Sequence, residues 1–338
     1  MIIGVNTLSL QPGYGGREAF IHNTLRAIQA HSRESHFVLF TDPGNHEAFE
    51  GWKRVQVDGP KALGDAVAEA RVQILLSPLE SALAKCPVAQ CVLVMDLQKF
   101  PNESGGWRWL KGGAQRAAHQ ICSEARSVIA PSEFIKRELL QKLEVAMEKI
   151  VVCPLGVDPA FDTRQAPFVE PPYILTVGRT DETKNVAMLR SVMATLWQEI
   201  PHSLVVVGQA GDAEPEDWGP RVIRVEQAPS IQLAALYQHC ELVVLPSAYE
   251  GSGVAALEGL RAGTTVVCGR VGGIPEVAHT APIYFNPENR GSLAAAIRRG
   301  LGEKPSERRS RHEAGRKLAL EFTWDRCASK TMQALRRT

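Results

Sequence analysis

Short apolar runs alternate with amphipathic stretches along nearly the whole chain. In the first half the apolar runs occupy 2–8, 36–41, 72–77, 90–96, 126–131 and 149–154. In the second half they occupy 173–178, 202–208, 221–225, 241–246, 264–269 and 282–285. The stretches between them have the spacing of helices, as at 17–31 and 132–144, where Ser132 is a suitable N-cap. Regular alternation of strand and helix predicts parallel sheets covered by helices.

The pattern also predicts two domains, which agrees with a length of 338 residues. The alternation lapses at 155–172, a stretch rich in Pro and Asp that is the best candidate for a linker. We therefore expect two Rossmann-like, doubly wound α/β domains at 1–165 and 166–320. The charged tail predicts two helices with a break near Phe322 and Thr323, and we treat 321–338 as a separate C-terminal helix.

Composition narrows the functional class. Apolar content is 44%, charged content is 22% and the net charge is +1, which is ordinary for a globular protein and argues against a general nucleic-acid binder. The seven cysteines are scattered without metal-ligand spacing, so we expect buried, reduced thiols and a cytoplasmic location. No apolar run is long enough to span a bilayer, and the first residues lack the charged front of a signal peptide.

The segment 246–276 carries the strongest chemical signal. Glu250 lies in a Gly-flanked turn after an apolar run, and Glu258 lies eight residues later on the expected following helix. Open α/β sheets bind ligands at the carboxyl ends of their strands, and a helix N-terminus favours phosphate. Carboxylates accept hydrogen bonds from hydroxyls, so the expected ligand has both phosphate and hydroxyl groups, as a nucleotide-sugar does. The alternative is a solvated glutamate in the loop and an unrelated glutamate on the helix that takes part in an ordinary ion pair.

A second candidate is the turn at 178–185, directly after another predicted strand. Arg179 and Lys184 bracket it, and Gly178 precedes it. Fixed cations would stabilise the growing charge of a leaving diphosphate. The alternative is a surface turn with solvated charges.

Two weaker candidates follow strands of the first half. The Gly-rich turn at 12–20 contains Gly15 and Gly16. Gly13 and Gly15 fit the first two glycines of the dinucleotide-binding pattern GxGxxG, but Glu18 holds the position of the third. It is either a loop that approaches the ligand closely or a structural turn. Asp96 follows the strand at 90–96 and either orients a hydroxyl group or caps a helix.

Three further features have mainly structural interpretations. The segment 107–120 mixes aromatic and cationic residues and is either an amphipathic helix or a contact with an anionic acceptor or membrane surface. His22 and His119 lie on predicted helices without evident ligand partners. The acidic stretch 211–219 lacks a clear metal-binding pattern and suggests a solvated connection.

These motifs resemble the retaining GT-B glycosyltransferases, specifically glycosyltransferase family 4. The similarity spans nearly the whole chain and includes ARSVIAPSEFIKRELLQKLEVAMEKIVVCPLGVDPAF, YILTVGRTDETKN, CELVVLPSAYEGSGVAALEGLRAGTTVVCGRVGGIPEVA, FNPENRGSLAAAI and FTWDRCASKTM. The resemblance implies a GT-B fold, an acceptor-side first domain, a nucleotide-sugar-binding second domain and a last helix that packs back on the first domain. It also implies catalysis without a metal or other cofactor.

The resemblance assigns a role to each candidate residue. Glu250 would bind sugar hydroxyls, Glu258 the ribose, and Arg179 and Lys184 the diphosphate. Backbone groups would approach the sugar and phosphate at Gly251, Ser252, Gly253 and Val254. Gly15 and Gly16 would line the cleft from the first domain, and Asp96 would belong to the catalytic set.

Two departures from the family pattern concern the sugar pocket. Met95 precedes Asp96 where the family often has histidine, and Ser252 stands where it often has phenylalanine. The resemblance predicts transfer of a sugar from GDP-mannose or a UDP-sugar to a glycan, lipid-linked or small-molecule acceptor, with peripheral membrane contact as an option. The alternatives are a catalytically weak or inactive nucleotide-sugar-binding subunit and an NAD-dependent enzyme, which the broken GxGxxG pattern disfavours.

Overall fold

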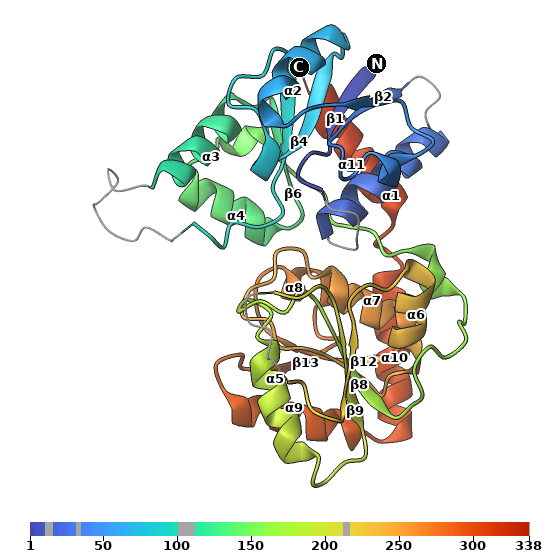
Figure 1. Ribbon diagram of the computed structural model, residues 1–338. Coiled ribbons are helices and arrows are strands. Elements are labelled where there is room, and N and C mark those ends of the chain that lie inside the picture. The colour runs from blue at the N-terminus through green and yellow to red at the C-terminus, as the bar shows by residue number, and fades with distance from the viewer. Residues whose placement is uncertain (11–15, 32–34, 101–111, 212–216, 338) are drawn as a thin grey trace. The chain divides into compact units, whose positions relative to one another are not determined.

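The computed structural model describes residues 1–10, 16–31, 35–100, 112–211 and 217–337. The chain forms two compact units (Figure 1). The first comprises Met1–Leu155 with Trp324–Thr338, and the second comprises Gly156–Thr323. Each unit is a parallel β-sheet with helices on both faces, as the alternating pattern predicts.

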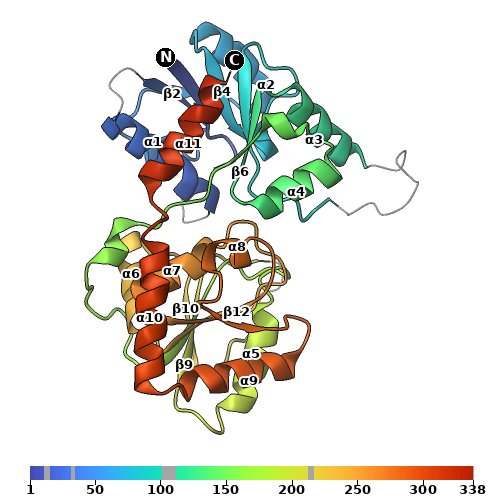
Figure 2. The ribbon, with the colours of Figure 1, turned by 180° about the vertical axis from the view of Figure 1, so that it is seen from behind.

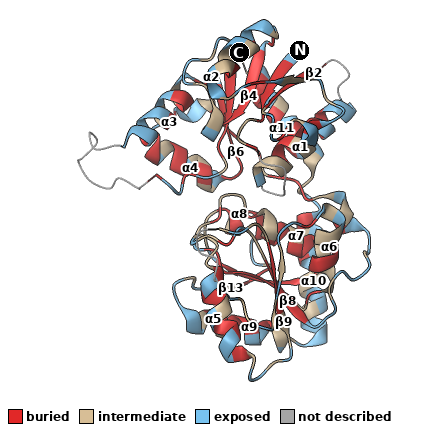
Figure 3. Cartoon of the chain, in the orientation of Figure 1, coloured by how far each residue is buried: buried red, intermediate tan, exposed pale blue. Residues whose placement is uncertain are grey.

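The first unit contains a seven-stranded parallel sheet in the order β3-β2-β1-β4-β5-β6-β7. Its strands are β1 (Ile2–Asn6), β2 (His36–Thr41), β3 (Arg54–Gln56), β4 (Ile74–Pro78), β5 (Ala89–Leu93), β6 (Ser127–Ala130) and β7 (Ile150–Val152). β1 pairs with both β2 and β4, so the strand order reverses at this central position. The central strands are almost wholly buried (Figure 3), which explains their continuous apolar sequence.

The α-helices of the described residues that cover this sheet are α1 (Gly16–His31), α2 (Pro60–Glu69), α3 (Gly113–Glu124), α4 (Glu133–Lys142) and α11 (Trp324–Arg336). Ser132 caps α4 by accepting a hydrogen bond from the Ile135 N–H at 3.1 Å, as predicted. The C-terminal helix α11 packs beside α1 (Figures 1 and 2), and Ser127 donates to the Ala334 carbonyl at 2.9 Å. Short 3-10 turns occupy Glu47–Phe49, Leu79–Ser81 and Met147–Lys149.

The second unit contains a six-stranded parallel sheet in the order β10-β9-β8-β11-β12-β13. Its strands are β8 (Tyr173–Val177), β9 (Ser203–Val207), β10 (Val222–Val225), β11 (Leu242–Leu245), β12 (Thr265–Gly269) and β13 (Ile283–Phe285). Its helices are α5 (Val186–Leu196), α6 (Ser230–His239), α7 (Val254–Ala262), α8 (Ile274–Ala278), α9 (Arg290–Leu301) and α10 (Pro305–Ala319). Alternate strand residues enter two separate cores, with Val243 in the core beside α6 and α7 and Val244 in the core beside α5 and α9.

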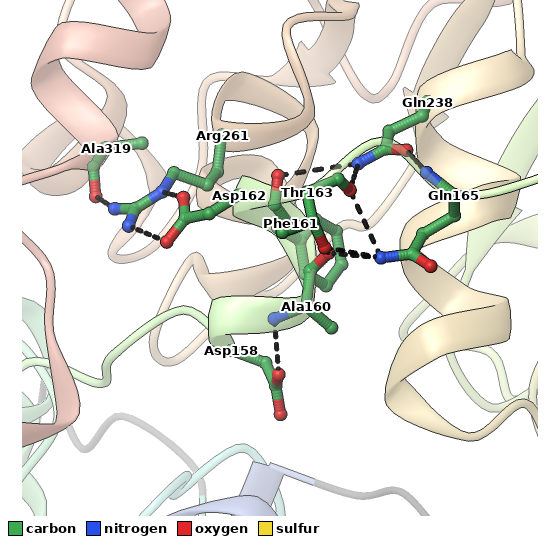
Figure 4. A network of polar contacts seen from close by, with 9 residues as sticks. All are labelled: Asp158, Ala160, Phe161, Asp162, Thr163, Gln165, Gln238, Arg261 and Ala319. Carbon is green, nitrogen blue, oxygen red and sulfur yellow. Dashed lines mark hydrogen bonds and ion pairs between the residues drawn. The ribbon is translucent and has the colours of Figure 1, made fainter.

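The expected linker at 155–172 is only partly a connection. Residues Pro159–Asp162 form a 3-10 turn, η5, whose Phe161 is buried and meets the Tyr237 ring edge-on, with ring centres 5.4 Å apart. Arg261 holds Asp162 with two hydrogen bonds of 2.5 and 2.8 Å (Figure 4). These contacts explain why the second unit begins at Gly156, whereas the sequence suggests a boundary after residue 165.

No helix in the described part of the chain is both long and apolar enough to cross a membrane. The seven cysteines form no disulfide, and all except Cys86 are buried.

Candidate functional site

Two loops meet at the carboxyl ends of β8 and β11 in the second unit. The Ala248 N–H of the second loop donates to the Thr183 carbonyl of the first at 2.9 Å. Beside this link, Nζ of Lys184 lies 2.6 Å from Oε2 of Glu250. Glu250 is 8% exposed, so its carboxylate is largely removed from water and Lys184 balances its charge. The structure thus joins the two strongest candidate segments of the sequence.

The first loop has a fixed turn that directs Lys184. The Asp181 carboxylate accepts hydrogen bonds from the Thr183 hydroxyl at 2.5 Å and from the backbone N–H groups of Thr183 and Lys184 at 3.0 and 3.1 Å. The Lys184 side chain lies over Gly178, where an added Cβ would come within 3.1 Å of two lysine carbons. Gly178 therefore leaves room for the lysine, a role that a strand-end glycine does not reveal from sequence alone.

The backbone of the second loop packs against Gly272 and Gly273, which lie between β12 and α8. The Gly273 N–H donates to the Glu250 carbonyl at 2.8 Å. Gly272 has φ +56°, and a Cβ at this position would lie 1.9 Å from the Glu250 carbonyl oxygen. Only glycine permits this approach of one backbone to another. The sequence displays the two glycines in the 246–276 block, but their function as a support for Glu250 depends on tertiary structure.

The N-terminus of α7 follows directly after Glu250. Gly253 precedes the helix with φ +72°, and a Cβ there would lie 2.7 Å from the Val277 side chain. The Ser252 hydroxyl accepts from the Val254 N–H at 3.4 Å. Gly251 also lies in this turn. The expected donor-binding turn therefore presents a helix N-terminus without bulky side chains, which favours an anionic group.

Glu258 lies on α7 and is partly buried. Its Oε2 accepts a hydrogen bond from the Tyr237 hydroxyl at 2.8 Å. Desolvation raises the pKa of Glu258 to about 7, and the charges of Asp158 and Glu250 act in the same direction, whereas the Tyr237 hydrogen bond opposes the shift. Tyr237 was not a sequence candidate, because a tyrosine on an apolar helix gives no signal distinct from core packing.

Arg179 lies in the expected loop at the end of β8, but it does not join the Lys184–Glu250 pair. Its side chain is exposed and forms no ion pair or hydrogen bond with another described residue. It is therefore a solvated cation in this structure, available to an anion at the carboxyl edge of the sheet.

Asp96 belongs to the first unit, where it lies three residues beyond the end of β5. It caps no helix. Partial desolvation and the nearby charge of Glu80 raise its pKa, whereas Arg17 and Lys99 lower it. Arg17 pairs with Glu80 at 3.1 Å, and neither residue was predicted from the sequence. A sequence signal was available for Glu80, which shortly follows the end of β4, whereas Arg17 is the second residue of α1.

The Gly-rich turn is described only in part. Gly15 lies outside the described residues. Gly16 begins α1, and an added Cβ at Gly16 would lie 3.4 Å from the terminal methyl of Met95. Met95 thus occupies space against the start of α1 within the first unit.

The two histidines have structural contacts. His22 stacks on Phe49 with ring centres 5.2 Å apart, and burial lowers its pKa. Nδ1 of His119 lies 2.6 Å from the Leu143 carbonyl oxygen. Of the segment 107–120, residues 107–111 lie outside the description, and the remainder belongs to α3 apart from Gly112. Of 211–219, residues 212–216 are also outside it. The described residues contain no cluster of three potential metal-ligating side chains.

Comparison with known proteins gives relatives that align with about two thirds of the chain. The chain is 29% identical over 244 residues to a glycogen synthase of Mycobacterium tuberculosis, covering 67% of this chain and 58% of the relative. It is 25% identical over 240 residues to an O-antigen chain mannosyltransferase B of Escherichia coli, covering 65% and 63%. The alignments therefore span about three fifths of these relatives.

The fold also has close structural neighbours. A sucrose-phosphate synthase from Thermosynechococcus elongatus superposes with a TM-score of 0.81 at 20% identity, covering 99% of this chain and 98% of the neighbour. Two parallel-sheet units of this kind make up the GT-B fold. Residues 159–318 match the family of glycosyl transferases group 1, and the chain carries a domain of that family. This confirms the resemblance at the level of family group and fold.

Proposed function

We propose that the protein is a retaining hexosyltransferase of glycosyltransferase family 4. It moves a sugar from a nucleoside-diphosphate sugar, such as GDP-mannose or a UDP-sugar, to a hydroxyl of a glycan, lipid-linked or small-molecule acceptor. The observation that carries the proposal is the Lys184–Glu250 contact of 2.6 Å beside the N-terminus of α7. A cation, a buried carboxylate and a helix N-terminus in one place match the phosphate and hydroxyl groups of such a donor. The names of the group 1 relatives support the reaction class.

The residues of the second unit have complementary tasks in this proposal. Lys184 and Arg179 stabilise the charge that grows on the leaving diphosphate, a task that fixed cations perform without a metal. Glu250 accepts hydrogen bonds from sugar hydroxyls, and Glu258 accepts them from the ribose. Lys184 approaches Glu250 in this structure, so donor binding would divide its hydrogen bonds between carboxylate and phosphate.

The chemical step exchanges one bond at the anomeric carbon for another. The bond from the anomeric carbon to the diphosphate oxygen breaks, and the acceptor oxygen bonds to that carbon on the same face. The acceptor proton passes to an oxygen of the leaving phosphate. The nucleotide-sugar is a substrate, and no resident cofactor is needed. We place this reaction in the cytoplasm, with peripheral contact at the inner membrane as part of the proposal when the acceptor is lipid-linked.

A nucleotide-sugar-binding subunit with weak or no catalysis is the second candidate. The observation that favours it is the contact of Met95 with Gly16, because a thioether cannot donate the hydrogen bond that an imidazole would give to a sugar. Transfer activity separates the two candidates, since a binding subunit would be stabilised by a donor without turning it over.

A thermal-shift screen against GDP-, UDP-, ADP- and dTDP-sugars identifies the donor, because a ligand of the folded state raises the melting temperature. Transfer and donor hydrolysis are then measured with the stabilising donor and a broad acceptor panel. We expect turnover in the native protein and at least a 100-fold loss in Lys184→Ala and Glu250→Gln. Lys317→Ala and Glu313→Gln are matched controls, because both residues are exposed on α10. Binding without turnover would favour the subunit, and unchanged turnover in both site variants would refute the proposed mechanism.

A further inference from the structure

A groove of about 1040 Å³ opens on the second unit between the end of α8, helix α9 and helix α10. Helices α9 and α10 are consecutive and are both visible in the view of Figure 2. The groove is formed by residues between His279 and Leu318, whereas Lys184 and Glu250 lie in the loops after β8 and β11. Its volume is at the upper limit of ordinary small-molecule pockets, so it has room for an extended ligand.

One carboxylate oxygen of Glu303 accepts a hydrogen bond, and the other has no donor among the described residues. Its side chain is 6% exposed, and its Oε1 accepts from Nε of Arg311 at 2.8 Å. Its Oε2 is buried and has no hydrogen-bond partner among the described residues. A buried carboxylate oxygen without a donor costs free energy, so a ligand or water that donates a hydrogen bond would be favoured beside it.

Other groove side chains supply hydrogen bonds of both kinds. Four side chains line the groove and form no hydrogen bond or ion pair with another described residue: those of Arg299, Ser306, Glu307 and Ser310. Serine hydroxyls donate and accept, arginine donates and glutamate accepts. A ligand that satisfies this set must itself donate and accept hydrogen bonds within a short distance.

The charges in the groove are balanced. Two of its arginines are already neutralised, since Arg298 forms two hydrogen bonds with Glu199 at 2.6 and 2.8 Å and Arg311 pairs with Glu303. Arg299 and Glu307 remain, with opposite charges. The paired residues offer no net charge, and Arg299 and Glu307 offset one another, so the groove favours neither an anion nor a cation. Ala314 and Leu318 add apolar surface against which the C–H face of a sugar ring can pack.

We propose that this groove is a second carbohydrate-binding site, which takes a neutral oligosaccharide. A chain of sugars provides many hydroxyl groups that both donate and accept, carries no net charge and has apolar ring faces. Binding in this groove requires no sugar transfer, so it stands apart from the proposed reaction. It would retain a glycan on the second unit independently of the donor site.

Affinity electrophoresis of the full-length protein tests the proposal. Native gels contain a soluble α-glucan or α-mannan, and saturating UDP or GDP occupies the proposed donor site. We expect concentration-dependent retardation, weakened at least fivefold by Ser310→Trp, which fills the groove, and by Arg299→Ala. Glu313→Trp and Arg309→Ala are matched controls outside the groove. Relative to its own mobility in a polymer-free gel, each should be retarded as much as the native protein.

Three results would overturn the assignment. The first is no retardation by either neutral polymer, and the second is equal retardation of Ser310→Trp and the native protein. The third is retardation only in gels that contain dextran sulfate, which would make the groove an anion site. Thermal unfolding of each variant checks that a lost interaction does not reflect a lost fold.

Discussion

Lys184 and Glu250 form an ion pair of 2.6 Å although 66 residues separate them in the chain. Three features of the two loops support this pair. The Asp181 carboxylate fixes the turn before Lys184, Gly178 leaves room for the lysine side chain, and the Ala248 N–H donates to the Thr183 carbonyl. A contact supported in this way has a fixed geometry before any ligand binds. Such preorganisation is what electrostatic stabilisation of a leaving group requires.

Removal of Lys184 should affect stability as well as activity. Lys184→Ala leaves the buried Glu250 carboxylate without its cation, and we expect the free energy of unfolding to fall by about 1–3 kcal/mol. The double variant Lys184→Ala/Glu250→Gln should recover part of this loss, because it removes the unpaired charge. Chemical denaturation of the two single variants and the double variant gives the coupling free energy. Strictly additive losses would show that the pair contributes nothing to the fold.

Arg179 should behave differently from Lys184, because its side chain is solvated and unpaired with described residues. We expect Arg179→Ala to change the free energy of unfolding by less than about 0.5 kcal/mol. If the proposed diphosphate contact is correct, the donor KM should rise roughly tenfold or kcat should fall. Steady-state kinetics with the donor found by thermal shift measures this effect. Unchanged kinetic constants would remove Arg179 from the site.

Gly272→Ala should disrupt the support of Glu250. The new Cβ would lie 1.9 Å from a backbone oxygen, which no side-chain rotation can relieve. We expect a loss of about 3 kcal/mol or more in stability and a loss of transfer activity. Gly263→Ala is the matched control, because Gly263 also has a positive φ of +74° but has open space around its Cβ position. Its cost should be about 1 kcal/mol, measured by the same denaturation experiment. Equal losses in the two variants would mean that strain, and not the close approach, governs Gly272.

Glu258 should make stability depend on pH. Its pKa is raised from 4.5 to about 7 in the folded protein, so the folded state holds this proton more tightly than the unfolded state. The stability linked to that proton is fully present below about pH 4.5 and is lost as pH rises through 7. Glu258→Gln keeps an acceptor for Tyr237 but cannot titrate.

The free energy of unfolding of Glu258→Gln, relative to the native protein, should therefore rise by roughly 2 kcal/mol between pH 5 and pH 8. Urea denaturation across this pH range measures it, and Glu313→Gln, exposed on α10, is the control. Parallel pH profiles for Glu258→Gln and the native protein would show that Glu258 has an ordinary pKa.

The sequence by itself determined the two sheets and the loops that carry the chemistry. Strands such as β11 and β12 are buried on both faces, so their apolar residues run continuously and are recognisable without tertiary information. Glu250 and Lys184 were identifiable because they follow such strands and accompany glycines. The linker was misjudged in part, because its Pro-rich composition does not reveal that Phe161 is buried or that Asp162 pairs with Arg261.

Only the tertiary structure decided which of these residues touch. Lys184 reaches Glu250 because β8 and β11 are neighbours in the sheet, although 64 residues (178–241) lie between the end of β8 and the start of β11. No local sequence pattern specifies the order of strands in a sheet. The same holds for Tyr237 with Glu258 and for Gly272 beneath Glu250, whose contacts join α6 to α7 and the β12–α8 loop to the β11–α7 loop. Periodicity along the chain fixes which face of an element is buried, whereas packing between distant elements fixes what a buried polar group meets.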